Sequence, residues 1–139
     1  MSKAFESISE LLSCARRVAV VGLSAHPDRP SHGVAQYMQR HGFRIIPVNP
    51  TYAGQQILGE HCYATLTQAA REHGPIEIVD CFRKPADILP VAMEAAAIGA
   101  RCLWLQLGIV NQEAARIALD AGMMVVMDRC LKLEHAALH

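Results

Sequence analysis

Five short apolar runs, separated by segments with helical spacing, constrain the fold more than any other feature of the sequence. The first run, at 18–21, has none of the apolar–polar alternation of a strand with one face in water. Strands of this kind are buried on both faces, as in parallel sheets covered by helices on both sides. The other expected strands are 44–48, 77–82, 101–107 and 123–127.

Segments with helical spacing lie between these strands. They cover 8–16, 32–41, 66–72, 85–98 and a stretch that begins after Asn111, and a short helical tail follows Cys130. Parallel neighbours need crossovers of about a dozen residues, which a helix commonly supplies. We predict an α/β fold: a Rossmann-like, doubly wound, open parallel sheet of about five strands with helices on both faces. Without repeat or linker, residues 1–139 are expected to form one domain.

Composition and charge exclude several classes of protein. The formal net charge is +0, so the basic excess of a nucleic-acid binder is missing. The apolar runs fall short of the roughly 18 residues of a membrane helix, and the opening of the chain lacks a signal-peptide pattern. The 5 cysteines contain no C-x-x-C, which favours reduced thiols. We expect a cytoplasmic protein that contacts neither nucleic acid nor membrane, with no protein partner indicated.

The C-terminal ends of the strands are where a ligand should bind, because doubly wound sheets bind ligands where the strand order reverses. The loop after the first strand and the helix start near Ser31 form an anion site from backbone amides. Gly22 lets a phosphate approach the backbone, so Gly22→Val is expected to block the ligand and leave the fold largely intact. Ser24 and Arg29 add hydrogen-bond donors for such a ligand. The alternative is that Ser24 and Ser31 only stabilise the turn and the cap. Arg83, at another strand end, suits a phosphate or a stacked ring.

A dinucleotide is the obvious rival ligand. Its fingerprint is G-x-G-x-x-G, with an acidic residue about 20 positions later that holds the ribose. Here Ser24 occupies the place of the second glycine, and the second strand ends in Val48-Asn49-Pro50, without a carboxylate. An NAD(P)-binding oxidoreductase is therefore a less favoured alternative.

Several motifs at the strand ends match a known family. They are Val18-Ala19-Val20-Val21-Gly22-Leu23-Ser24 with Asp28-Arg29-Pro30-Ser31, Ile46-Pro47-Val48-Asn49-Pro50, Ile57-Leu58-Gly59, Val79-Asp80-x-Phe82-Arg83, Leu103-Trp104-x-Gln106-x-Gly108 and Met127-Asp128-Arg129-Cys130. In this order the chain resembles small stand-alone CoA-binding proteins (the YccU-like group). It is also similar to the N-terminal CoA-binding domain of the succinyl-CoA synthetase alpha subunit.

The resemblance implies a bound coenzyme A or acyl-CoA. Its pyrophosphate would rest on the first loop, at Gly22, Leu23 and Ser24. Its adenine and ribose would lie near Val48, Asn49, Pro50, Phe82 and Arg83. Its pantetheine arm would extend toward Gln106, Gly108 and Ile109. The synthetase also has a domain with a phosphorylated histidine and an ATP-grasp partner, which we expect this chain to lack, so the resemblance implies binding without ligase chemistry.

No catalytic residue and no metal site are predicted. The 7 histidines follow no ligand spacing, and we expect them at solvated or helix-end positions. Cys130 is the one candidate nucleophile, but no base partner can be assigned to it, although His26 belongs to the same end of the sheet. Trp104 is expected in the core. The predicted function is a non-catalytic CoA-binding or regulatory module; the alternative is a CoA-dependent enzyme, an acyltransferase or a thioester-handling protein.

Overall fold

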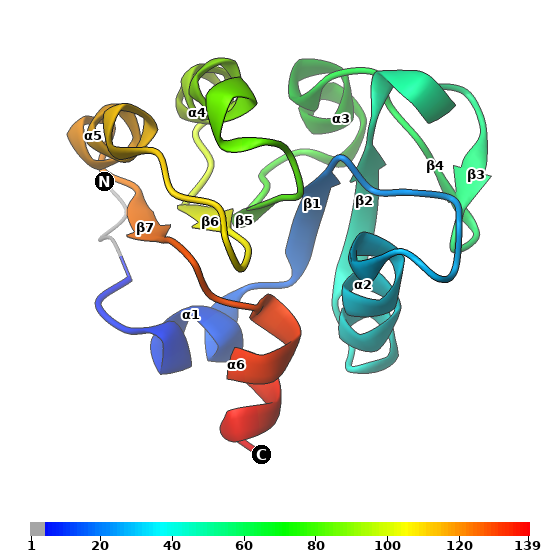
Figure 1. Cartoon of the computed structure of the whole chain (residues 1–139), viewed down its shortest axis with the longest axis horizontal. Helices are drawn as coiled ribbons and strands as arrows, with labels where there is room; N and C mark the ends of the chain where they lie inside the picture. The colour runs from blue at the N-terminus through cyan, green and yellow to red at the C-terminus, as the bar shows by residue number, and fades with distance from the viewer. Residues whose placement is uncertain (1–4) are drawn as a thin grey trace.

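Five parallel strands form the main sheet of the computed structural model, which describes residues 5–139 (Figure 1). Residues 1–4, part of the opening segment considered for a signal peptide, lie outside the described residues. The strand order is β2-β1-β5-β6-β7, with β1 at Arg17–Val21, β2 at Arg44–Val48, β5 at Ile78–Cys81, β6 at Cys102–Leu105 and β7 at Met124–Val126. The predicted Rossmann-like parallel sheet is therefore confirmed.

Helices cover both faces of this sheet (Figure 1). One face carries α1 (Ile8–Cys14), α2 (Pro30–Arg40) and α6 (Leu131–Ala137), and the other carries α3 (Leu66–His73), α4 (Ile88–Ala97) and α5 (Gln112–Asp120). Within residues 5–139, none of these helices has the length and apolar composition needed to cross a membrane.

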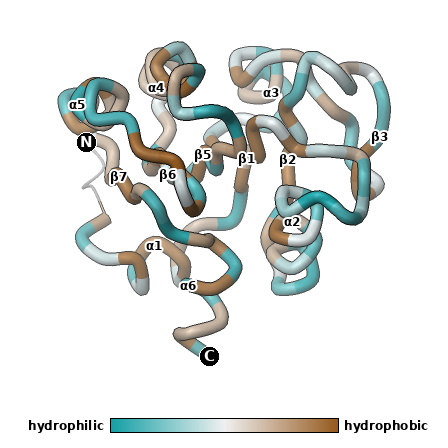
Figure 2. Tube along the Cα trace, in the orientation of Figure 1, coloured by the Kyte–Doolittle hydropathy of each residue, from teal (hydrophilic) through white to brown (hydrophobic). Residues whose placement is uncertain are grey.

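The core has two halves, one on each side of the sheet. Val18 and Val20 of β1 pack with the layer of α1, α2 and α6, whereas Ala19 and Val21 pack with the layer of α3, α4 and α5. Figure 2 shows hydrophobic residues along the strands and polar residues mainly on the outer helix surfaces and loops. Burial on both faces explains why the strand runs contain no polar alternation.

The strand order reverses at β1, which lies between β2 and β5. The chain leaves β1 toward α2 on one face. It leaves β5 through a short 3-10 helix, η2 (Pro85–Asp87), toward α4 on the other face. The two connections diverge, so a crevice opens between them at the C-terminal ends of the strands, as in other doubly wound sheets.

Two details differ from the sequence-based expectation. Helix α2 begins at Pro30 rather than at His32, because proline fits the first helical position, where no N–H is needed. The region after β2 is also more regular than expected. It contains a 3-10 helix, η1 (Pro50–Tyr52), and a small antiparallel hairpin of β3 (Gln56–Ile57) and β4 (Glu60–His61).

Pro47 lies inside the edge strand β2 without breaking its ladder. Its carbonyl points away from β1 and accepts a hydrogen bond from the Tyr63 amide at 3.0 Å. In a parallel ladder the N–H and C=O of one residue point to the same side, so the N–H that proline lacks would also have pointed away from β1. The pairing of β2 with β1 therefore extends over Arg44–Val48.

Candidate functional site

Two adjoining cavities occupy the crevice at the C-terminal edge of the sheet. The loop cavity, of about 420 Å³, is lined by Gly22, Ser24, His26, Arg29, Pro30, Ser31, Asn49, Thr51, Tyr52 and Phe82. The apolar cavity, of about 560 Å³, is lined by Pro30, Val34, Phe82, Arg83, Lys84, Pro85, Gln106, Leu107, Ile109 and Cys130. Pro30 and Phe82 line both cavities. The cavities therefore adjoin, and one extended ligand can occupy the two together.

Gly22 is required by the packing of the first loop against the loop after β5. Its φ of +88° lies in the region that favours glycine, and a Cβ there would come within 2.5 Å of the Phe82 carbonyl oxygen. The expectation that Gly22→Val leaves the fold intact is therefore wrong, because the valine side chain would collide with backbone atoms. Sequence reasoning identified the glycine but assigned it to the ligand alone.

The two serines of the loop cavity hold the first loop in place. The Ser31 hydroxyl, at the start of α2, accepts a hydrogen bond from the Ser24 amide at 3.0 Å. The Ser24 hydroxyl accepts one from the His26 amide, also at 3.0 Å. Each hydroxyl uses a lone pair in these bonds and keeps its own proton for donation. The serines thus hold the turn of the first loop and can donate to a ligand, but neither caps α2, whose N-cap residue is Arg29 without a side-chain cap hydrogen bond.

Asn49 connects the ends of β1 and β2. Its side-chain amide donates to the Leu23 carbonyl at 3.0 Å, and its side-chain oxygen accepts from the Thr51 amide at 3.0 Å. The side chain is buried, and these two bonds use both of its polar ends. Asn49 therefore positions the first loop, while its own side chain is already engaged.

Two arginines give the crevice a positive character. Arg29 lines the loop cavity, and Arg83 lines the apolar cavity. Within residues 5–139, neither guanidinium has a hydrogen-bond or ion-pair partner, and no carboxylate lines the loop cavity. The Arg83 stem also lies within 3.5 Å of the point that a Cβ on Gly22 would occupy. Cations without anionic partners beside the hydroxyls of Ser24 and Ser31 favour a negatively charged ligand.

The remaining predicted residues lie around the same edge. Val48, Pro50 and Arg83 line a third cavity of about 310 Å³, the rear cavity, which also contains Thr65, Asp87 and Glu94. Ile109 lines the apolar cavity.

Three other predicted residues have their polar groups or side chains engaged within the protein. The Leu23 side chain is buried in the core. Gln106 also lines the apolar cavity, but its side-chain oxygen accepts a hydrogen bond from the Leu131 amide at 3.1 Å. The Gly108 amide donates to the Asp128 carboxylate at 2.7 Å. Leu23 and Gly108 therefore contribute no lining to the three cavities.

Cys130 and His26 occupy different parts of the crevice. Cys130 precedes α6 and lines the apolar cavity, whose lining contains no imidazole or carboxylate among the described residues. His26 lines the loop cavity, where its ring faces Tyr52 with centroids 6.4 Å apart. Trp104 is fully buried, as predicted, and its indole donates to the Arg129 carbonyl at 2.8 Å.

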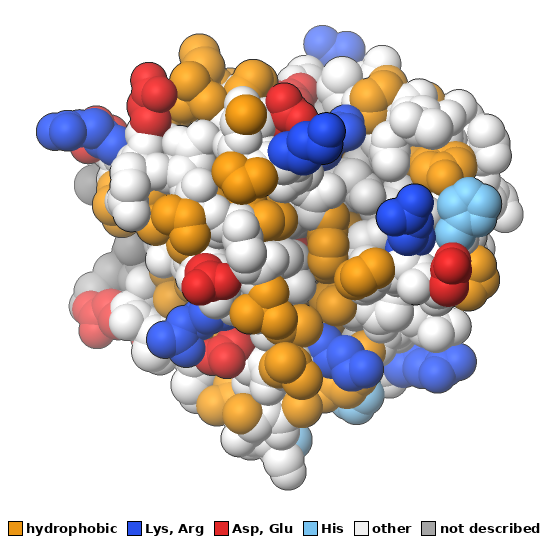
Figure 3. Space-filling model, in the orientation of Figure 1, with side chains coloured by type: hydrophobic (Ala, Val, Ile, Leu, Met, Phe, Trp, Pro, Cys, Tyr) orange, Lys and Arg blue, Asp and Glu red, His pale blue; other side chains and the backbone are white. Residues whose placement is uncertain are grey.

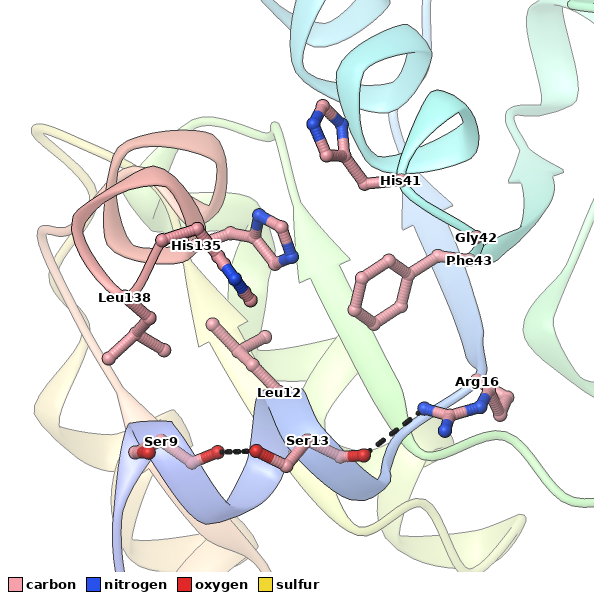
Figure 4. Close-up of a pocket in the computed structure, with 10 residues that line it drawn as sticks. Ser9, Leu12, Ser13, Arg16, His41, Gly42, Phe43, His135 and Leu138 are labelled. Carbon is pink, nitrogen blue, oxygen red and sulfur yellow. Dashed lines mark hydrogen bonds between the residues drawn. The ribbon is translucent and has the colours of Figure 1, made fainter.

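A fourth cavity lies at the opposite end of the sheet (Figure 4). This histidine cavity, of about 600 Å³, is lined by Ser9, Leu12, Ser13, Arg16, His41, Gly42, Phe43, His135, Leu138 and His139. The C-terminal ends of α1, α2 and α6 meet around it, and helix C-termini carry partial negative charge. This end of the fold is therefore less suited to a phosphate ligand than the C-terminal edge.

His135 is the centre of an aromatic cluster in the histidine cavity. Its ring centroid lies 5.2 Å from that of His41 and 4.4 Å from that of His139, and its Nδ1 is 2.9 Å from the Tyr37 hydroxyl. Burial lowers the pKa of His135, and the neighbouring His139 and His41 lower it further. His135 and His32 are both buried rather than solvated, and they lie in the last turn of α6 and the first turn of α2, which agrees with the helix-end alternative of the prediction.

Asp80 is a buried carboxyl group that sequence reasoning did not single out. It lies on the central strand β5, in register with Val20 and Trp104, and its side chain is 0% exposed. Neither carboxyl oxygen has a hydrogen-bond partner in the described part of the chain. Burial therefore raises the pKa of Asp80 well above its ordinary value. The signal in the sequence was a single charged residue within a strand that is otherwise apolar.

Comparison with known proteins places this geometry in context. A family model described as a CoA binding domain matches residues 16–136. The Bacillus subtilis (strain 168) uncharacterized protein YneT is 43% identical over 129 residues, which cover 93% of this chain and 92% of that protein. A solved Thermus thermophilus structure, cell-free ID.343, has a TM-score of 0.89 and 36% identity, covering 95% of this chain and 96% of the other. A hypothetical protein from Pyrococcus horikoshii OT3 has a TM-score of 0.88 and 33% identity, and the match covers 99% of this chain and 97% of the other.

Proposed function

Because the chain belongs to the CoA-binding domain family, we propose that it binds coenzyme A or an acyl-CoA in the crevice at the C-terminal edge of its sheet. The observation that carries this location is the loop cavity. There the Ser24 and Ser31 hydroxyls, the start of α2 and an unpaired arginine meet without a carboxylate, while the Gly22, Ser24 and His26 amides are already bonded within the protein. Such an arrangement suits a pyrophosphate.

The rest of the ligand follows from the neighbouring cavities. The pyrophosphate would contact the first loop at Gly22–Ser24, together with Ser31 and Arg29. The adenosine would lie toward Val48 and Pro50 in the rear cavity, beside Arg83. The pantetheine arm would pass Phe82 and enter the apolar cavity toward Gln106 and Ile109. Asn49, whose side chain is engaged, would act by positioning the loop.

The proposed role is that of a non-catalytic binding or regulatory module in the cytoplasm. Among the side chains that line the loop and apolar cavities, His26 and Cys130 are the ones suited to proton transfer or nucleophilic attack. They line different cavities, so neither has the other as a catalytic partner there. A dinucleotide is less suited to the site, because Asn49 stands where NAD-binding proteins carry the acidic residue that holds the ribose.

CoA is expected to raise the melting temperature of the protein, and NAD and NADP are expected to raise it far less. A ligand present at 100 times its Kd stabilises the native state by about 2.7 kcal/mol, roughly 10 °C for a domain of this size. Differential scanning fluorimetry with each ligand at matched concentration measures the shift. Equal or greater protection by NAD would contradict the proposal.

A pair of arginine variants locates the binding. Arg83→Ala should weaken CoA binding about tenfold or more, since a hydrogen bond to a charged group contributes about 1.5–3 kcal/mol. Arg71→Ala, on the exposed surface of α3, is the matched control and should leave the Kd unchanged. Calorimetric titration gives both values. Equal effects of the two changes would show that CoA binds away from Arg83.

No thiol release from acetyl-CoA, succinyl-CoA or longer acyl-CoA is expected beyond the uncatalysed background. The reason is that Cys130 shares the apolar cavity with no imidazole or carboxylate that could take its proton. Chromatographic separation of CoA from acyl-CoA after incubation measures the reaction without interference from protein thiols. Turnover by the wild type that disappears in Cys130→Ser would make the protein an enzyme and refute a purely binding role.

A further inference from the structure

The apolar cavity differs in character from the loop cavity beside it. Pro30, Val34, Phe82, Pro85, Leu107 and Ile109 supply most of its wall. Its one neutral polar side chain, Gln106, is buried and already accepts a hydrogen bond from the Leu131 amide. Arg83, Lys84 and Cys130 complete the lining, and the rest of the wall offers mainly hydrophobic surface, which favours an apolar ligand group.

The mouth of this cavity exposes large apolar side chains to water. Leu107 is 60% exposed and lines the cavity, and Val110, in the same loop, is 45% exposed. Figure 3 shows hydrophobic side chains near the middle of this face, with charged side chains beside them. Isolated apolar residues on a surface need no explanation, but apolar residues at the rim of an apolar cavity indicate a ligand that covers them.

The position of the cavity along the ligand identifies the group that it would hold. The loop cavity, where the proposed function puts the pyrophosphate, meets the apolar cavity at Pro30 and Phe82. From the pyrophosphate, the pantetheine arm leads to the sulfur atom, and an acyl group is the only part of an acyl-CoA beyond it. A ligand that crosses at Phe82 thus brings its sulfur and acyl end toward Leu107 and Ile109.

We propose that the apolar cavity binds the acyl chain of an apolar acyl-CoA, so that the protein prefers such thioesters to free CoA. This inference rests on the proposed function and adds the class of ligand. Each methylene group moved from water into the cavity should tighten binding about fourfold. A dicarboxylic acyl group, such as succinyl, adds few methylene groups and must lose the hydration of its carboxylate beside a mainly apolar wall, so we expect it to gain no affinity over free CoA.

Calorimetric titration of the whole protein with CoA, succinyl-CoA and octanoyl-CoA tests this inference. We expect octanoyl-CoA to bind at least about tenfold more tightly than CoA, and succinyl-CoA no more tightly than CoA. If none of the three binds, the proposed function fails. If CoA binds and octanoyl-CoA binds no better, the proposed function stands and this inference is wrong. Tighter binding of succinyl-CoA, through Arg83 or Lys84, would also overturn it.

A matched pair of variants separates the cavity from general surface effects. Leu107→Asn removes an apolar side chain from the lining of the cavity, and because Leu107 is 60% exposed, we expect the variant to fold. It should reduce the ratio of octanoyl-CoA to CoA affinity about fivefold or more. Leu119→Asn makes the same change on α5, at a side chain that is 59% exposed and outside this cavity. In Leu119→Asn the ratio of octanoyl-CoA to CoA affinity should stay at the wild-type value. An equal reduction of this ratio in both variants would refute the inference.

Discussion

Gly22→Ala should destabilise the protein by about 3–5 kcal/mol and abolish CoA binding at concentrations that saturate the wild type. The φ of +88° alone makes any side chain unfavourable, by about 1–2 kcal/mol. The larger part comes from the Phe82 carbonyl oxygen, 2.5 Å from the new Cβ, because backbone atoms of the loop after β1 or of the loop after β5 must move to relieve that contact. Either movement displaces the floor of the loop cavity.

Gly42→Ala is the control for this prediction. Gly42 has a similar φ of +92°, but nothing lies within 4 Å of the Cβ that alanine would add. It should therefore show only the backbone effect of about 1–2 kcal/mol. Urea denaturation of both variants gives the comparison. Equal destabilisation by the two changes would mean that the contact with Phe82 has no energetic weight.

Replacing Asp80 with an uncharged residue should stabilise the protein near neutral pH. Asp80→Val removes a fully buried carboxyl group without partners and fits the strand beside Val20, so we expect a gain of about 2–3 kcal/mol in the free energy of unfolding. Asp80→Asn keeps the shape of the side chain and removes only the ionisation of the carboxyl group. Asp120→Asn, exposed at the end of α5, is the control and should change stability little. Destabilisation by both Asp80 variants would show that the carboxyl group makes a favourable interaction.

The pH dependence of this effect has a defined sign. Burial raises the pKa of Asp80 in the folded state well above its ordinary value of 3.8, which applies to the unfolded chain. Below that value both states are protonated. As the pH rises from 3.8 toward the raised pKa, only the unfolded state loses its proton, and stability falls by about 1.4 kcal/mol per pH unit. The difference between wild type and Asp80→Asn should therefore grow with pH over this range, and a flat difference would contradict the buried carboxyl.

The strands were the most predictable part of the fold. Continuous apolar runs such as 18–21 have few alternatives to a parallel sheet covered on both faces, and each run falls on an observed strand. The start of α2 was placed too late, although Pro30 carried the signal for the first helical position. The hairpin of β3 and β4 depends on contacts with the edge of β2, which local pattern does not reveal.

The candidate site was predictable in its location and less so in its internal roles. The strand-end rule brought Gly22, Arg29 and Arg83 to one crevice without any knowledge of contacts. The hydrogen bonds of Asn49 to Leu23 and Thr51 depend on the meeting of two loops. The histidine cavity likewise joins α1, α2 and α6, which are far apart in the sequence, so spacing along the chain gave no sign of His135 at its centre.

The arrangement of Pro47 and Tyr63 also bears on how the molecule resists aggregation. An edge strand with free amides and carbonyls is a template for pairing with another chain. On the outer side of β2, Pro47 has no N–H to offer and its carbonyl is bonded to the Tyr63 amide, while the Asn49 amide is bonded to the Tyr63 carbonyl at 2.9 Å. A strand from a second molecule therefore cannot extend the sheet along this end of β2, which keeps the edge next to the crevice closed to intermolecular pairing.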